Sequence, residues 1–255
     1  MNRRFMGKVA LVTGATSGIG QATAVRLARE GALVAVNRRP DLDARETLAL
    51  VKAAGGEAFD IAADMRDPDA VKAMVAEAAK RGRRLDYVVS NAAINPSLSW
   101  EATTVAAFDE LFEVNVRGAW IVCTQGARQM IAEGHGGAMV MVSSISAHVG
   151  APTQVAYCGT KGAISMLGKA LGAVMGKHGI RVNVIEPGAV ATNMSAELLS
   201  DPMALKYYQD RIALGRVGKP AELAASIAFF LSDDASYVTS ATLLVDAGFI
   251  VNAEL

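Results

Sequence analysis

The sequence predicts an α/β fold in which a parallel sheet is covered by helices on both faces. Short runs rich in β-branched residues alternate with longer segments of helical hydrophobic period. Repeated strand–helix–strand units of this kind imply parallel strands. Apolar residues make up 52% of the 255 residues, ample for a substantial core in one large domain or two small ones.

Seven short segments are predicted to be strands, because β-branched and apolar residues favour extended backbone. The third is the weakest of them. The strands are expected at Lys8–Val12, Leu33–Asn37, Glu57–Ala62, Leu85–Ser90, Ala138–Ser143, Ile180–Ile185 and Thr242–Val245.

The predicted helices lie between these strands. Asp67 is a plausible N-cap with Pro68 at the first helical position, which marks one helix start. The segment Thr103–Ala132 is expected to form one long helix or two. The other helices are expected at Gly18–Glu30, Leu42–Ala54, Pro68–Arg81, Gln154–Lys177 and Pro220–Leu231.

The least regular segment is Ala189–Leu214, which mixes small, polar and apolar residues and contains Pro202. It follows a strand whose carboxyl end faces the region where ligands of α/β sheets bind. We expect it to be a substrate lid, since long loops in compact domains are often functional. The alternative is an ordinary excursion packed on the surface.

Charge and cysteine content exclude several classes. Lys plus Arg and Asp plus Glu both total 25, so a nucleic-acid partner is not expected. Cys123 and Cys158 offer neither a disulfide framework nor metal-ligand spacing. With no signal-peptide h-region and no apolar stretch of roughly 18 to 20 residues, we expect a soluble cytoplasmic protein without a membrane partner.

A glycine-rich turn follows the first strand, in the segment Thr13–Gly20. Glycines let the backbone approach a pyrophosphate, and the N-terminus of the next helix favours negative charge. The spacing G-x-x-x-G-x-G differs from the generic G-x-G-x-x-G, and a turn serving packing alone is the alternative. The expected cofactor contacts here are Gly14, Thr16, Ser17, Gly18, Ile19 and Gly20.

Cofactor choice is expected to depend on the end of the second strand. An acid there would bind the ribose 2′-OH of NAD, whereas an arginine suits the 2′-phosphate of NADP. Arg38 and Arg39 stand at this point, so NADP is predicted, with NAD possible. The alternative is that both arginines are solvated and Asp41 or Asp43 binds the ribose.

Further cofactor contacts are expected after the next two strands. Asp64, with Met65 beside it, could accept a hydrogen bond from the adenine amino group or could cap a turn. After the fourth strand come Asn91, Ala92 and Ala93, where small residues let the chain pass beside a cofactor.

Tyr157 and Lys161 are four residues apart and fall on one helix face. A nearby ammonium lowers the pKa of a tyrosine from its usual value near 10, so Tyr157 is predicted to be a general acid/base. Ser144 follows the fifth strand and could hold the substrate oxygen. Asn115 is a poor helix former inside a helical segment, and a local break that holds a water next to Lys161 is expected there.

Together these motifs resemble the short-chain dehydrogenase/reductase family over essentially the whole chain, 1–255. The resemblance implies a single Rossmann-like, three-layer domain with a seven-stranded parallel sheet, a Ser–Tyr–Lys site assisted by Asn, and usually a homodimer or homotetramer. It also implies that Pro187, Gly188 and Thr192 flank the nicotinamide carboxamide, with Val190 beside it. One departure is Ala93, because the family commonly has Gly there.

Within the family, the segments 214–220 and 243–252 are similar to bacterial aldose 1-dehydrogenases, notably those that act on L-rhamnose. This implies oxidation of an aldose at C1 to a lactone. The alternatives are a reductase of a ketone or 3-oxoacyl thioester and, less favoured, a non-catalytic regulator. An apolar pocket for a ketone could use Trp100, Met194 and Leu198; the candidate sugar-binding residues are Asn95, Ser146, His148, Gln154 and Asn193.

Overall fold

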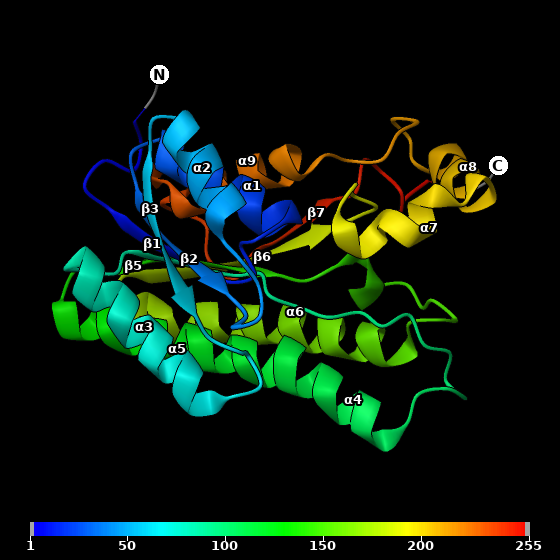
Figure 1. Cartoon of the computed structure of the whole chain (residues 1–255), viewed down its shortest axis with the longest axis horizontal. Helices are drawn as coiled ribbons and strands as arrows, with labels where there is room; N and C mark the ends of the chain where they lie inside the picture. Colours follow the sequence, from blue (N-terminus) through cyan, green and yellow to red (C-terminus); the bar gives the residue numbers. More distant parts are fainter. Residues whose placement is uncertain (1–2, 253–255) are drawn as a thin grey trace.

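The computed structural model describes residues 3–252, so the first two and last three residues of the expected domain 1–255 lie outside the described part. The predicted fold class is confirmed: seven parallel strands form one sheet in the order β3-β2-β1-β4-β5-β6-β7 (Figure 1). Their bounds are β1 Val9–Val12, β2 Leu33–Arg38, β3 Glu57–Ala62, β4 Tyr87–Ser90, β5 Gly137–Val142, β6 Ile180–Pro187 and β7 Thr242–Val245.

Helices cover both faces of this sheet. In Figure 1 one layer contains α1 (Gly18–Arg29), α2 (Arg45–Ala53) and α9 (Pro220–Leu231). The opposite layer contains α3 (Pro68–Gly82), α4 (Val105–Phe112), α5 (Ala119–Glu133) and α6 (Val155–Met175). No helix within residues 3–252 combines the length and apolarity needed to cross a membrane.

Side-chain alternation along the strands builds two cores, one on each face. In β1, Ala10 and Val12 pack in the core with α1 and α9, whereas Leu11 packs in the core with α3, α5 and α6. Every residue of β1 is buried, which explains why it reads as an apolar run without alternation. Truncating the fully buried Leu11 to Ala would cost about 2–5 kcal/mol.

Two segments differ in detail from expectation. The stretch predicted as one long helix or two is α4 and α5, joined by a π-helical turn at Glu113–Gly118. The expectation of an irregular 189–214 was incomplete, because this segment contains α7 (Ala196–Ser200) and α8 (Pro202–Arg211). Asp201 caps α8 by accepting from the Met203 N–H at 2.9 Å.

The sheet order reverses between β1 and β4, which place their carboxyl ends side by side. Ligands of open α/β sheets bind at such a switch point. A cavity of about 400 Å³ lies there.

Candidate active site

Two glycines at the junction of β1 and α1 occupy positions that leave no room for a side chain. Gly14, in the loop, has φ +60°, and a Cβ there would stand 2.8 Å from the Ala92 Cα. A Cβ at Gly20, in the first turn of α1, would lie 2.3 Å from the Gly14 oxygen, so Gly20 lets the loop pack against α1 and does not line the cavity. Ser17 makes no side-chain capping bond to the first turn of α1. This tight loop at a helix N-terminus suits a pyrophosphate.

Two buried polar side chains hold that loop in place. Asn37, at the end of β2, accepts from the Gly14 N–H at 3.1 Å and donates to the Ala63 oxygen at 3.2 Å. The Thr13 hydroxyl accepts from the backbone N–H groups of Asn91 and Ala92 at 2.9 and 3.0 Å. Sequence reasoning missed the role of Asn37, although an amide in an otherwise apolar strand was a usable signal.

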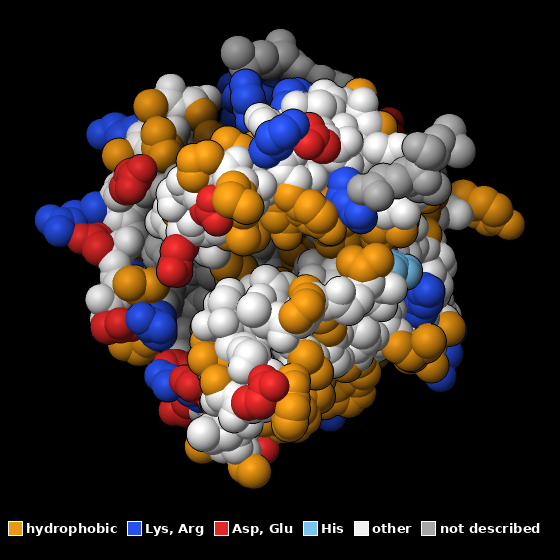
Figure 2. Space-filling model, turned by 90° about the vertical axis from the view of Figure 1, so that its right-hand side faces the viewer, with side chains coloured by type: hydrophobic (Ala, Val, Ile, Leu, Met, Phe, Trp, Pro, Cys, Tyr) orange, Lys and Arg blue, Asp and Glu red, His pale blue; other side chains and the backbone are white. Residues whose placement is uncertain are grey.

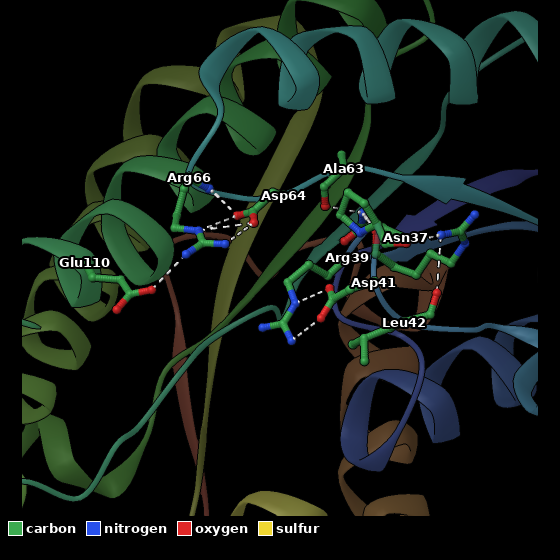
Figure 3. Close-up of polar contacts among 10 residues, drawn as sticks. Asn37, Arg39, Asp41, Leu42, Ala63, Asp64, Arg66 and Glu110 are labelled. Carbon is green, nitrogen blue, oxygen red and sulfur yellow. Dashed lines mark hydrogen bonds and ion pairs between the residues drawn. The ribbon is translucent and has the colours of Figure 1, made fainter.

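At the adenosine end, the two predicted arginines have separate surroundings, and Figure 3 shows Arg39 beside Asp41. Arg39 lines the cavity and pairs with Asp41, its Nε 2.5 Å from Oδ1 and its NH2 2.7 Å from Oδ2. Arg38 is not among the cavity-lining residues; it bonds Asp60 and the carbonyl oxygens of Pro40 and Leu42. The geometry therefore favours Arg39 alone as a phosphate ligand.

Asp64 also lines the cavity, but its carboxylate is held by Arg66, both by the side chain at 2.6 Å and by the backbone N–H at 2.9 Å. Arg66 reaches on to Glu110 of α4 at 3.0 Å (Figure 3). These charge-assisted bonds lower the pKa of Asp64, with the Arg66 side chain the largest cause. The lowered pKa keeps Asp64 an acceptor, as an adenine amino group requires.

Three of the four predicted catalytic side chains meet at the other end of the cavity, and the fourth, Asn115, is not among the cavity-lining residues. Ser144 follows β5, and Tyr157 and Lys161 lie on the first turns of α6; all three line the cavity. Tyr157 is 8% and Lys161 3% exposed. The Lys161 ammonium lies 5.4 Å from the Tyr157 ring centroid and donates to the Val142 oxygen at 3.0 Å.

The pKa values of Tyr157 and Lys161 are shifted mainly by burial, and not by the charge of the neighbouring ammonium. Desolvation raises the pKa of Tyr157, with an opposing hydrogen bond to Ser144, and lowers the pKa of Lys161 to about 8. We expected the Lys161 ammonium and the charge of an oxidised nicotinamide to lower the Tyr157 pKa together; among the residues of the chain, burial outweighs any such effect of Lys161. A positive charge beside Tyr157, as on an oxidised nicotinamide ring, would act against the desolvation.

Asn115 lies in the π-helical turn, so the predicted local break exists. It is 2% exposed, and its amide oxygen accepts from the Ile94 N–H at 2.8 Å. Its amide nitrogen donates to the Ile94 oxygen at 3.0 Å and the Thr160 hydroxyl at 3.2 Å. Asn115 thus ties the chain after β4 to α6, next to Lys161.

Four of the five candidate sugar-binding residues line the cavity: Asn95, Ser146, Gln154 and Asn193. His148 does not; its Nε2 is hydrogen-bonded to the buried Glu186 carboxyl at 2.6 Å, so the expectation for His148 as a substrate ligand is corrected. Trp100 is 69% exposed and also lies outside the cavity lining.

The segment after β6 forms the remaining wall. The predicted contacts Pro187, Gly188, Val190 and Thr192 line the cavity, as do Met65, Ala92 and Ala93. Sequence reasoning missed Tyr208 of α8, which lines the cavity and stacks on Phe249 with centroids 5.5 Å apart. Figure 2 looks at this end of the molecule and shows a hollow bordered by hydrophobic side chains.

The cavity thus has the parts that a nicotinamide dinucleotide needs. A glycine loop at a helix N-terminus suits the pyrophosphate, and Asp64 and Arg39 flank the adenosine end. The opposite end places Ser144, Tyr157 and Lys161 beside Pro187 and Gly188. When bound, such a cofactor supplies a hydride acceptor or donor next to a side chain able to move a proton.

Comparison with known proteins agrees with this arrangement. A family model described as Enoyl-(Acyl carrier protein) reductase matches residues 14–250. The chain is 41% identical over 249 residues to the L-rhamnose 1-dehydrogenase (NAD(P)(+)) of Sphingomonas sp. (strain SKA58), covering 97% of this chain and 98% of that protein. It is 34% identical over 251 residues to the L-rhamnose 1-dehydrogenase (NADP(+)) of Thermoplasma acidophilum, covering 98% and 99%.

A solved structure of a short-chain type dehydrogenase/reductase from Mycobacterium marinum superposes with a TM-score of 0.92 at 30% identity, covering 97% of both chains. Similarity of this extent reaches every part of the cavity, from the glycine loop to the segment after β6. The chain therefore belongs to the short-chain dehydrogenase/reductase family and is an NAD(P)-dependent oxidoreductase that acts on CH–OH groups.

Proposed function

We propose that the protein oxidises an aldose at C1 to the lactone, with L-rhamnose as the first candidate substrate. The observation that carries the proposal is the set of polar side chains from separate segments that line the cavity with Ser144 and Tyr157: Asn95, Ser146, Gln154 and Asn193. A sugar presents hydroxyls around its ring, so its binding site needs several donors and acceptors. The names of the relatives from Sphingomonas and Thermoplasma support the same substrate.

In this reaction Ser144 would hold the C1 oxygen through its hydroxyl. Tyr157, in its ionised form, would accept the proton of the C1 hydroxyl, and Lys161 would stabilise that form. A bound nicotinamide would supply the acceptor for the hydride from C1. Asn115 would hold the turn beside Lys161 and, with it, a water that carries the proton onward.

We propose NADP as the preferred cofactor, with Arg39 as the ligand of the 2′-phosphate. Arg39 lines the cavity, and its guanidinium could bind phosphate through two N–H groups. Asp41 already occupies those groups, so the preference is moderate and NAD remains usable. Arg38 would contribute by holding the loop, through Asp60 and the Leu42 oxygen.

The segment 189–214 is proposed as the substrate lid of a single catalytic domain. It contributes Val190, Thr192 and Asn193 to the cavity wall near the catalytic residues and Tyr208 farther along the chain. Its helices α7 and α8 stand apart from the two helix layers in Figure 1.

A second candidate function is reduction of a ketone or 3-oxoacyl thioester with the same residues acting in reverse. The apolar side chains of the lid that line the cavity favour it: Met194, Leu198 and Leu199. Tyr157 would then donate the proton to the carbonyl oxygen.

We also propose a homodimer or homotetramer. Phe108 of α4 and Trp120 of α5 are 43% and 45% exposed, and aromatic residues are enriched at subunit interfaces. Light scattering after size-exclusion chromatography would measure the mass, and a monomer at micromolar concentration would contradict this proposal.

The substrate proposal is tested by measuring cofactor reduction across aldoses, polyols and secondary alcohols, with NADP⁺ and NAD⁺ in parallel. We expect the highest kcat/KM with L-rhamnose and lactone as the product. Turnover confined to carbonyl reduction with NADPH would reject the sugar and support the second candidate. A Gln154→Ala variant should raise the sugar KM more than the KM of the cofactor.

A further inference from the structure

A buried carboxyl group lies directly behind the catalytic residues. Glu186, the penultimate residue of β6, is 0% exposed and precedes Pro187 of the cavity wall. Its neighbour Ile185 packs in the core with α1 and α9, so strand alternation directs Glu186 toward α6. A buried carboxyl group is costly unless its oxygens are hydrogen-bonded.

Both oxygens of Glu186 have partners on other elements. Oε1 lies 2.5 Å from the Ser165 hydroxyl oxygen of α6, and Oε2 lies 2.6 Å from His148 Nε2. His148 follows the short 3₁₀ turn after Ser144, and its side chain is 44% exposed. The group therefore links the end of β6 to α6 and to the segment after β5.

The linkage continues to the residues that act on substrate. Ser165 Oγ lies 2.9 Å from Ser143 Oγ, and Ser143 Oγ lies 2.7 Å from the Lys161 backbone oxygen. Ser143 directly precedes Ser144, and Ser165 is one helical turn beyond Lys161. One buried network thus joins the three elements that carry Ser144, the Tyr157–Lys161 pair and Pro187.

We propose that Glu186 is a positioning residue: through Ser165 and Ser143 it fixes the oxygen-binding serine at the end of β5 relative to the Tyr157–Lys161 pair on α6. Proton transfer to a positioned side chain depends on hydrogen-bond distances, and small displacements of reacting groups lower turnover steeply. This role does not depend on which alcohol is the substrate.

The network contains more oxygen–oxygen contacts than the two serine hydroxyls can supply with hydrogens. Three oxygen–oxygen contacts run from Lys161 through Ser143 and Ser165 to Glu186, and two hydroxyls supply two hydrogens. A glutamine at position 186 would add an N–H toward Ser165 while its oxygen accepts from His148 when Nε2 carries the ring hydrogen. Glu186→Gln should therefore keep the geometry, whereas Glu186→Leu removes it.

The first test is Ser165→Ala, measured with the best alcohol from the substrate panel. We expect kcat to fall about tenfold while the cofactor KM stays within about twofold. Ser232→Ala is the matched control, because Ser232 is also buried but its hydroxyl donates to the Phe229 oxygen and accepts from Arg4. Equal kcat in Ser165→Ala and Ser232→Ala would overturn the proposal.

The second test compares Glu186→Gln with Glu186→Leu. We expect Gln to stay within about threefold of the original kcat and Leu to lose at least about tenfold. A Gln variant as impaired as the Leu variant would overturn the hydrogen-bonding role.

A third readout needs no substrate. Ionisation of Tyr157 is followed by tyrosinate absorbance in the NADP⁺ complex, as the difference from Tyr157→Phe. We expect Ser165→Ala to move this titration to higher pH, because Lys161 is less well placed to stabilise the tyrosinate. An unmoved titration would contradict the proposal even if the substrate proposal also failed.

Discussion

The two ends of the cavity are built in opposite ways. At the catalytic end, Tyr157, Lys161 and Asn115 are at most 8% exposed and sit on helices packed against the sheet. At the adenosine end, Arg39 and Asp41 form an ion pair whose side chains are 48% and 60% exposed. Buried groups have fixed geometry and displaced pKa values, whereas exposed pairs contribute little and exchange partners easily. The chemistry should therefore tolerate substitution poorly, and cofactor choice should shift readily.

The strongest test of the buried end is Tyr157→Phe. Loss of the Tyr157 hydroxyl, the proposed general acid/base, should lower kcat by about 10²–10⁴-fold. Dissociation constants for NADP⁺, measured by fluorescence, should stay close to the original. Turnover within tenfold of the original enzyme would show that another group moves the proton.

Asn115→Ala tests whether the catalytic end also stabilises the fold. It would leave the Ile94 N–H and oxygen unpaired in a partly buried site, so we expect a loss of about 1–3 kcal/mol in the free energy of unfolding. Urea denaturation measures it. The control Asn193→Ala, at an exposed residue, should change stability by less than about 0.5 kcal/mol.

The pH dependence of stability probes Lys161 directly. Its folded-state pKa of about 8 lies below the ordinary 10.5, so the unfolded chain binds more protons between these values. The free energy of unfolding should therefore rise with pH, by up to about 2 kcal/mol between about pH 8 and pH 10. Above about pH 10 the raised pKa of Tyr157 acts in the opposite direction.

Urea titrations at several pH values, repeated on Lys161→Met, isolate this contribution. The difference between the two proteins should grow over the stated window and stay flat below it. A difference independent of pH would mean that Lys161 is solvated in the folded protein.

The smallest effect is expected at the exposed end. Arg39→Ala should lower the ratio of kcat/KM for NADP⁺ over NAD⁺ by about three- to tenfold, because the guanidinium is a solvent-screened ligand. The matched variant Arg38→Ala, which loses the Asp60 pair outside the cavity, should change the ratio by less than Arg39→Ala does. If Arg38→Ala lowered this ratio more than Arg39→Ala, Arg38 would be the phosphate ligand instead.

Local patterns were sufficient for the fold class and for the order of the strands along the chain. Asp67 before Pro68 predicted a helix start, and Asp67 does cap α3 by accepting from Asp69 and Ala70. The same signal, Asp201–Pro202, starts α8 but was overlooked in a segment without a clear apolar period. The sequence of α8 has no apolar stripe because none of its residues is buried in the structure.

The sequence by itself determined the α/β architecture, the glycine loop, and the pairing of Tyr157 with Lys161. These follow from chain-local spacing: strand and helix periods, and the i,i+4 position on one helix face. Only the tertiary structure decided which of two adjacent arginines faces the cavity, and that His148 serves Glu186 rather than a substrate. Those outcomes depend on Asp60 and Glu186, which lie 22 and 38 residues from Arg38 and His148. Local sequence patterns do not predict which residues so far apart in the chain come into contact.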